Sequence, residues 1–75
     1  MDKEKEELRN EYALELNDLK NWFDWYDTQV MQYQRDLRLN GSSTIDLISL
    51  DALALKNATR IKELKELIEE TYRED

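Results

Sequence analysis

The chain has 75 residues with one glycine and no proline, cysteine or histidine, and its 18 acidic residues outnumber 11 basic ones to give a formal net charge of −7. This length holds one small domain, and the near absence of turn residues excludes a β-sandwich or barrel. The acidic balance argues against nonspecific binding to nucleic acid or to anionic membranes, which requires a basic face.

The residue types also disfavour an enzyme. Without cysteine or histidine the chain has no thiol–imidazole pair, no histidine base and no histidine to help hold a metal ion. Its many carboxylates fall on helix faces that we expect to be exposed, where their pKa values are not tuned for acid–base chemistry. We therefore predict a non-enzymatic protein with no cofactor and no metal site.

Nothing in the sequence predicts a membrane protein. No apolar run approaches the ~18 residues of a membrane span. The first residues, MDKEKEEL, are polar and acidic, unlike a signal peptide. We therefore expect no membrane partner and a cytoplasmic location.

The first predicted helix covers about residues 3–39 and is defined by apolar residues that recur every seven positions. One series is Leu16, Phe23, Val30 and Leu37, and the second, offset by three, is Tyr12, Leu19, Tyr26 and Tyr33. These are the a and d positions of a heptad, which indicate a helix packed lengthwise against another helix. The charged residues before Leu8 lack an apolar stripe, so we expect this single domain, residues 1–75, to have frayed polar termini.

The only cluster of helix-breaking residues is NGSST at positions 40–44. Because the flanking pattern has a helical period, Asn-Gly indicates a helix end here and not a β-hairpin turn. We expect Gly41 to close the first helix in the left-handed conformation. Ser43 is the expected cap of the second helix, with Asp46 completing an approximate capping box.

The second predicted helix covers about residues 44–72 and repeats the heptad pattern. Its a positions are Leu47, Ala54, Ile61 and Ile68, and its d positions are Leu50, Asn57, Leu64 and Thr71. A short connection makes the helices antiparallel neighbours, so the predicted fold is an all-α, coiled-coil-like helical hairpin. The predicted layers are Leu37 with Leu50, Tyr33 with Ala54, Val30 with Asn57, Tyr26 with Ile61, Phe23 with Leu64 and Leu19 with Ile68. A shift of one a/d step is the alternative.

Asn57 is the polar exception in the second apolar stripe. Tyr26 is near enough in the predicted register to form a hydrogen bond with it. A buried asparagine in a coiled coil fixes register or oligomer state at some cost in stability. We therefore interpret Asn57 and Tyr26 as a polar pair that sets the register.

Closing the hairpin leaves apolar residues outside its seam: Leu14, Trp22, Trp25, Met31, Leu39, Ile45, Ile48, Leu53, Leu55 and Leu67. Two neighbouring tryptophans beside further apolar residues predict an interaction surface, for which we select Trp22, Trp25, Leu55 and Leu14. The simplest cover is a second copy. At the rise of an α-helix, Trp25 lies roughly 28 Å from the turn and Leu55 roughly 17 Å. In an antiparallel dimer that overlaps by about 45 Å, Trp25 of one copy is level with Leu55 of the other. We therefore predict a homodimeric four-helix bundle, with a heterologous protein partner as the alternative.

The basic residues near the turn are Arg35, Arg38, Lys56, Arg60, Lys62 and Lys65. Asp36, Asp46 and Asp51 interrupt them, so solubilising charges are favoured over a nucleic-acid site. Intrahelical ion pairs, such as Glu69 with Arg73, are expected.

The segment from residue 19 to 41, LKNWFDWYDTQVMQYQRDLRLNG, resembles a group of small uncharacterised proteins encoded by phages and prophages of Gram-positive bacteria. The matching features are Trp22-Phe23, Tyr26-Asp27, Gln29-Val30, Gln32-Tyr33, Arg35, and Arg38 before Gly41. The resemblance covers about a third of the chain and implies a phage-encoded accessory or structural protein. It assigns no activity, although it suggests a polar role for Asp27, Gln29 and Arg35.

Two functions follow as hypotheses. The first is a structural or adaptor protein that acts through protein–protein interaction. The second is an acidic inhibitor that mimics DNA and binds a nucleic-acid-binding protein. Its carboxylates would be those near the open end of the hairpin: Asp2, Glu4, Glu7, Glu11, Glu15, Asp18, Glu63, Glu66, Glu69, Glu70, Glu74 and Asp75.

Overall fold

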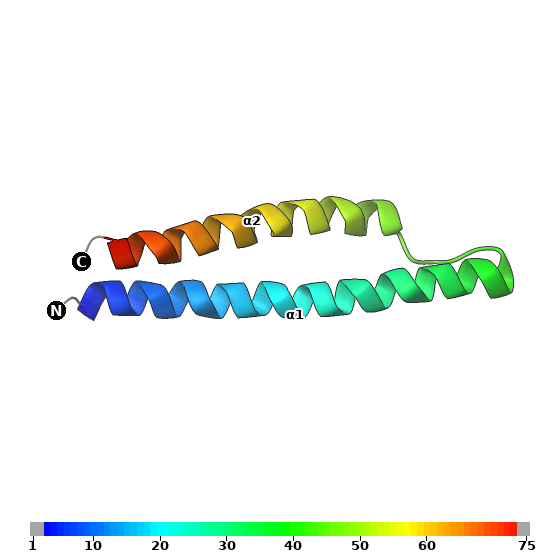
Figure 1. The fold of residues 1–75 in the computed structure, drawn as a ribbon. Helices are drawn as coiled ribbons and strands as arrows, with labels where there is room; N and C mark the ends of the chain where they lie inside the picture. The colour runs from blue at the N-terminus through cyan, green and yellow to red at the C-terminus, as the bar shows by residue number, and fades with distance from the viewer. Residues whose placement is uncertain (1–2, 74–75) are drawn as a thin grey trace.

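The computed structural model describes residues 3–73, which form two antiparallel helices joined by one connection (Figure 1). Helix α1 spans Lys3–Asn40 and helix α2 spans Leu47–Arg73. The molecule is a rod of 59 × 15 × 13 Å, with the first and last described residues at the same end. The predicted all-α helical hairpin is confirmed, and no strand occurs within residues 3–73.

Helix α1 ends as the sequence predicts, one residue beyond the expected boundary. Gly41 has a φ of 77° and its amide donates a hydrogen bond of 3.0 Å to the carbonyl of Leu37. A left-handed residue that closes this bond is a common helix end, and glycine adopts it without a steric penalty.

Helix α2 begins three residues later than predicted because its cap is Asp46 and not Ser43. One carboxylate oxygen of Asp46 accepts the backbone amide of Ser49 at 3.1 Å, and the other accepts the Ser49 hydroxyl at 2.7 Å. These bonds hold the pKa of Asp46 below its usual value. An aspartate suits this position because its negative charge lies at the positive end of the helix.

Ser43 instead fastens the connection to α1. Its hydroxyl donates to the Asp36 carboxylate at 2.7 Å and accepts the Ile45 amide at 3.2 Å. The bond from Ser43, followed by one from Gln32, lowers the pKa of Asp36. Figure 1 shows the result: the connection runs back along the end of α1 before α2 begins. Both serine and aspartate are good caps, and the path of the connection decides between them.

The path of the connection also corrects the predicted register. Tyr26 contacts Asp51 across the seam, although the predicted layer placed it opposite Ile61. Arg9 contacts Thr71, and Glu15 contacts Arg60. These contacts show that α2 is shifted along α1 by about two helical turns relative to the six predicted layers. This shift is larger than one a/d step, which was the predicted alternative. Leu37 consequently lies beyond the start of α2 and is 42% exposed, although it was predicted to pair with Leu50.

The seam holds very little closed core. Leu64 is the one hydrophobic side chain that is fully buried among the described residues, and Thr71 is the one buried polar residue. Helix α1 contributes no buried residue, and its a and d side chains are half-buried or exposed. The accessible surface is 6000 Å² for a 9.1 kDa chain, whereas a compact monomer of that mass would expose about 4,900 Å². The excess is about 1,100 Å² by the same relation.

Candidate interaction surface

The centre of α1 carries a cluster of aromatic rings. Trp22 stacks on Tyr26 with a centroid separation of 5.3 Å and an interplanar angle of 14°, and it meets Phe23 edge to face at 5.0 Å. Trp25 lies 6.2 Å from Trp22 in a tilted arrangement. Offset-stacked and edge-to-face pairs are the favoured geometries of aromatic side chains. The cluster therefore stabilises the rotamers of these residues without a second helix.

The structure brings together part of the predicted interaction surface. Trp22 is half-buried because its neighbours cover it, whereas Trp25 is 48% exposed. Leu55 and Leu14 are 72% and 68% exposed. Because Tyr26 lies beside Asp51, Trp25 and Leu55 lie within about one helical turn of each other along the rod. The prediction that they lie at different distances from the turn is therefore wrong. Leu14 lies about three turns away from Trp25 along α1.

The exposed apolar side chains are numerous for so small a chain, and all but Leu37 were predicted to lie outside the seam or were not assigned to it. Leu8, Leu37 and Tyr72 belong to this exposed set, together with Leu14, Leu55 and Trp25. Among residues 3–73, the large hydrophobic side chains at 40% exposure or more are Leu8, Leu14, Trp25, Met31, Leu37, Leu39, Ile48, Leu53, Leu55 and Tyr72. Single exposed apolar residues are ordinary, but such a density on one slender rod makes this surface a candidate interface.

The predicted polar pair of Tyr26 and Asn57 does not form. The Tyr26 hydroxyl donates instead to the Asp51 carboxylate at 2.5 Å, and this bond raises the pKa of Tyr26. Asn57 is half-buried on α2. The corrected register explains the change of partner, since it brings Asp51 within hydrogen-bond distance of Tyr26. A contribution of Tyr26 to the register therefore acts through Asp51.

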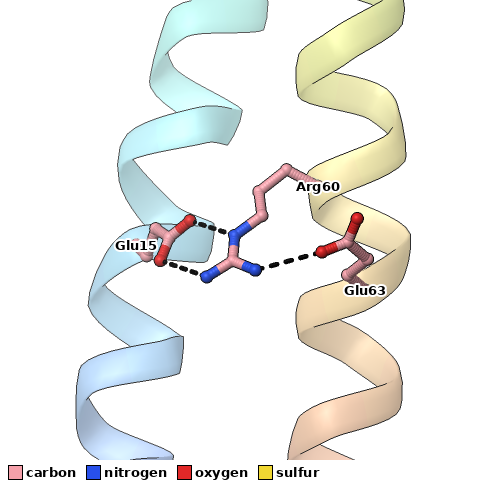
Figure 2. A network of polar contacts seen from close by, with 3 residues as sticks. All are labelled: Glu15, Arg60 and Glu63. Atoms are coloured by element: carbon pink, nitrogen blue, oxygen red, sulfur yellow. Dashed lines mark hydrogen bonds and ion pairs between the residues drawn. The ribbon is translucent and has the colours of Figure 1, made fainter.

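A charged network joins the helices nearer the open end of the hairpin (Figure 2). The Arg60 guanidinium donates to both carboxylate oxygens of Glu15, at 2.6 and 3.0 Å, and to Glu63 at 3.1 Å. This bidentate geometry is the strong form of an ion pair. Its hydrogen bonds lower the pKa of Glu15 and raise that of Arg60. Arg60 therefore belongs to the seam and not to a basic cluster available to nucleic acid.

Arg9 forms a second connection between the helices, which the sequence interpretation missed. Its guanidinium donates to the Thr71 hydroxyl at 3.0 Å and to the Thr71 carbonyl at 3.4 Å, and it lies 4.2 Å from the centre of the Tyr72 ring. Extending the a series back by one heptad from Leu16 reaches Arg9, so the heptad pattern contained this signal.

The outer face of α1 near the turn holds a groove of about 410 Å³ lined by Thr28, Met31, Gln32, Arg35 and Arg38. Gln32 donates to Asp36 at 2.8 Å. The polar set suggested by the resemblance is not assembled into one site. Arg35 lines the groove, Gln29 is half-buried, and Asp27 is exposed.

Residues 3–73 contain no group of three or more acidic side chains arranged to hold a metal ion. Neither helix, over the range that the structure describes, combines the length and apolar character needed to cross a membrane. Comparisons with protein-family models, curated protein sequences and solved structures found no match. The fold and its surface therefore carry the functional interpretation.

Proposed function

We propose that this protein is a non-enzymatic structural or adaptor protein that acts through protein–protein interaction, and that it self-associates as a homodimer of helical hairpins. The observation that supports this proposal is the missing core. In the part of the chain that the structure describes, one fully buried hydrophobic side chain accompanies ten large hydrophobic side chains that are 40% or more exposed. Two hairpins would bring four helices together and cover part of that surface.

The size of the uncovered surface suits a dimer. A stable interface buries about 800 Å² on each partner, and the rod exposes about 1,100 Å² more than a compact monomer of its mass. A lone hairpin of this length also has little apolar burial to offset the entropy of ordering its residues. Association supplies the missing burial.

The experiment is sedimentation equilibrium together with thermal unfolding by circular dichroism, over protein concentrations from about 1 to 100 µM. We expect a dimer whose unfolding temperature rises with concentration, as linkage between folding and association requires. A monomer across this range, with an unfolding temperature independent of concentration, would refute the homodimer.

A role as a phage-encoded accessory protein in the cytoplasm is part of the same proposal and rests on the sequence resemblance. Its test is capture of proteins from the native host by the wild-type chain and by a variant with Trp22 and Trp25 changed to alanine. Loss of a specific host protein from the variant would support an adaptor role, and an unchanged set of captured proteins would contradict it.

The alternative, an acidic mimic of DNA, has weaker support. Arg60 already binds Glu15 and Glu63, and Arg73 lies 3.7 Å from Glu69 as predicted, so several of its carboxylates are neutralised. Asp2, Glu74 and Asp75 of that acidic set lie outside the described residues. Binding to a basic, nucleic-acid-binding protein that weakens steeply with salt would favour this alternative.

A further inference from the structure

One face of α1 between positions 24 and 39 is exposed throughout. It is formed by residues spaced three, four and seven apart, so that they follow one side of the helix. The a and d residues between them, from Phe23 to Tyr33, are half-buried instead. The members of this outer face are Asp24, Trp25, Thr28, Met31, Gln32, Arg35, Arg38 and Leu39.

The two ends of the outer face are complementary to each other. An acid and an aromatic ring, Asp24 and Trp25, stand at one end, and a base and an aliphatic side chain, Arg38 and Leu39, stand at the other. Trp25, Met31 and Leu39 are 48%, 64% and 69% exposed. A twofold interface requires a surface that is complementary to itself, because the same surface of each copy forms both halves of every contact.

An antiparallel second copy of α1, with the twofold axis level with Met31 and Gln32, matches the face to itself. Along one edge of the face Asp24 faces Arg38 of the second copy, and along the other edge Trp25 faces Leu39 of the second copy; the twofold axis repeats both contacts at the opposite end. Met31 meets its own counterpart at the axis. Arg35 faces Thr28, so no pair of like charges is opposed.

The charged pair at the ends is available for such a contact. Within residues 3–73 no hydrogen bond or ion pair engages the side chain of Asp24 or Arg38, in contrast to Arg60, which two glutamates hold. Arg38 also lines the groove of about 410 Å³, together with Met31 and Arg35. The groove provides a recess for side chains of the facing helix.

We propose that the outer face of α1, from Asp24 to Leu39, is the dimer interface, and that its occupant is an antiparallel second copy of the same face. This proposal rests on the proposed homodimer and names its surface and orientation. It differs from the bundle expected from the sequence, in which Trp25 meets Leu55 of the second copy. The two copies of α1 lie at the centre of the dimer, and the two copies of α2 lie outside.

The test is a charge swap. In Asp24→Arg the two end pairs would each set a base against a base, and in Arg38→Asp each would set an acid against an acid. Because each substitution acts at two symmetric pairs, each variant alone is expected to dimerise with a dissociation constant raised about tenfold. An equimolar mixture of the two variants restores both attractive pairs, so a 1:1 heterodimer of near wild-type affinity is expected.

The matched controls are Glu66→Arg and Lys62→Asp, which change the net charge by the same amounts at exposed positions of α2. They are expected to dimerise like the wild type. Circular dichroism of every variant checks that the helices are intact. Sedimentation of the single variants, the mixture and the controls then measures the association.

The results separate the two proposals. A wild-type dimer with single variants that associate normally, or a mixture that remains as weak as its components, would overturn this interface while leaving the homodimer standing. A wild-type chain that is monomeric up to about 100 µM would overturn both, and the cover of the outer face would then be a different protein.

Discussion

Replacing Leu64 with alanine tests whether the hairpin seam stabilises the protein at all. Leu64 is the only hydrophobic side chain with no exposed surface among residues 3–73. It occupies a d position of α2, in the section of the rod between the Arg60 network and the Arg9 contact with Thr71. Alanine keeps the helix propensity of the position, so the substitution removes packing and little else.

The expected loss follows from the burial. Leucine to alanine removes three carbon atoms at about 0.8 kcal/mol each, which is about 2.4 kcal/mol before any cavity is counted. Fully enclosed sites lose about 3–5 kcal/mol, but a seam between two helices can relax or admit water. We therefore expect about 2–3 kcal/mol, against a total stability of about 4–11 kcal/mol for a chain of this length. The unfolding temperature should fall by about 10–20 °C.

Urea unfolding, followed by helical circular dichroism and by tryptophan fluorescence at fixed protein concentration, measures this loss. Leu55→Ala is the matched control, because Leu55 lies on the same helix and is 72% exposed. It should change the free energy of unfolding by less than about 0.5 kcal/mol. The reasoning is refuted if Leu64→Ala costs less than about 1 kcal/mol, or if Leu55→Ala costs as much as Leu64→Ala.

Three further outcomes are expected. Because the Arg60 hydrogen bonds lower the pKa of Glu15 from its ordinary 4.5, the stabilisation by this pair is present above that pH and is lost as the pH falls through the lowered pKa. Wild type should thus exceed Glu15→Gln in unfolding temperature at pH 7, and this difference should shrink as the pH is lowered below 4.5; a difference that does not shrink at low pH would contradict this. Gly41→Ala should lose about 1 kcal/mol in urea unfolding, since Gly41 has a φ of 77° and an added methyl group meets only open space; unchanged stability would show that this conformation is not required. Asp46→Ala should lower the unfolding temperature by a few degrees by removing the α2 cap, whereas the exposed Ser42→Ala should not, and equal effects would argue against Asp46 as the cap.

Much of the candidate surface could be predicted from the heptad pattern. Leu14, Trp25 and Leu55 fall outside the a and d positions and are exposed in the structure. Trp22 also falls outside them, but the rings of Phe23 and Tyr26 cover it in part. Contacts between neighbours on one helix depend on rotamers, which the heptad position does not specify.

The sequence by itself determined the two helices, their antiparallel hairpin and the helix end at Gly41. These features depend on local properties: helix propensity, a seven-residue period and the one residue that adopts a positive φ freely. A repeating pattern of apolar residues indicates which side of each helix meets the other. It does not indicate how far one helix slides along the other, because a displacement by whole heptads preserves the pattern.

Only the tertiary structure decided the register and the contacts that depend on it. Ser43 and Asp46 are both good caps, and the bond from Ser43 to Asp36 leaves Asp46 to begin α2. The connection then runs back along α1, so Tyr26 meets Asp51 and Arg60 meets Glu15. These contacts join residues 25 and 45 positions apart, and their geometry follows from the path of the whole connection, which no local sequence pattern specifies.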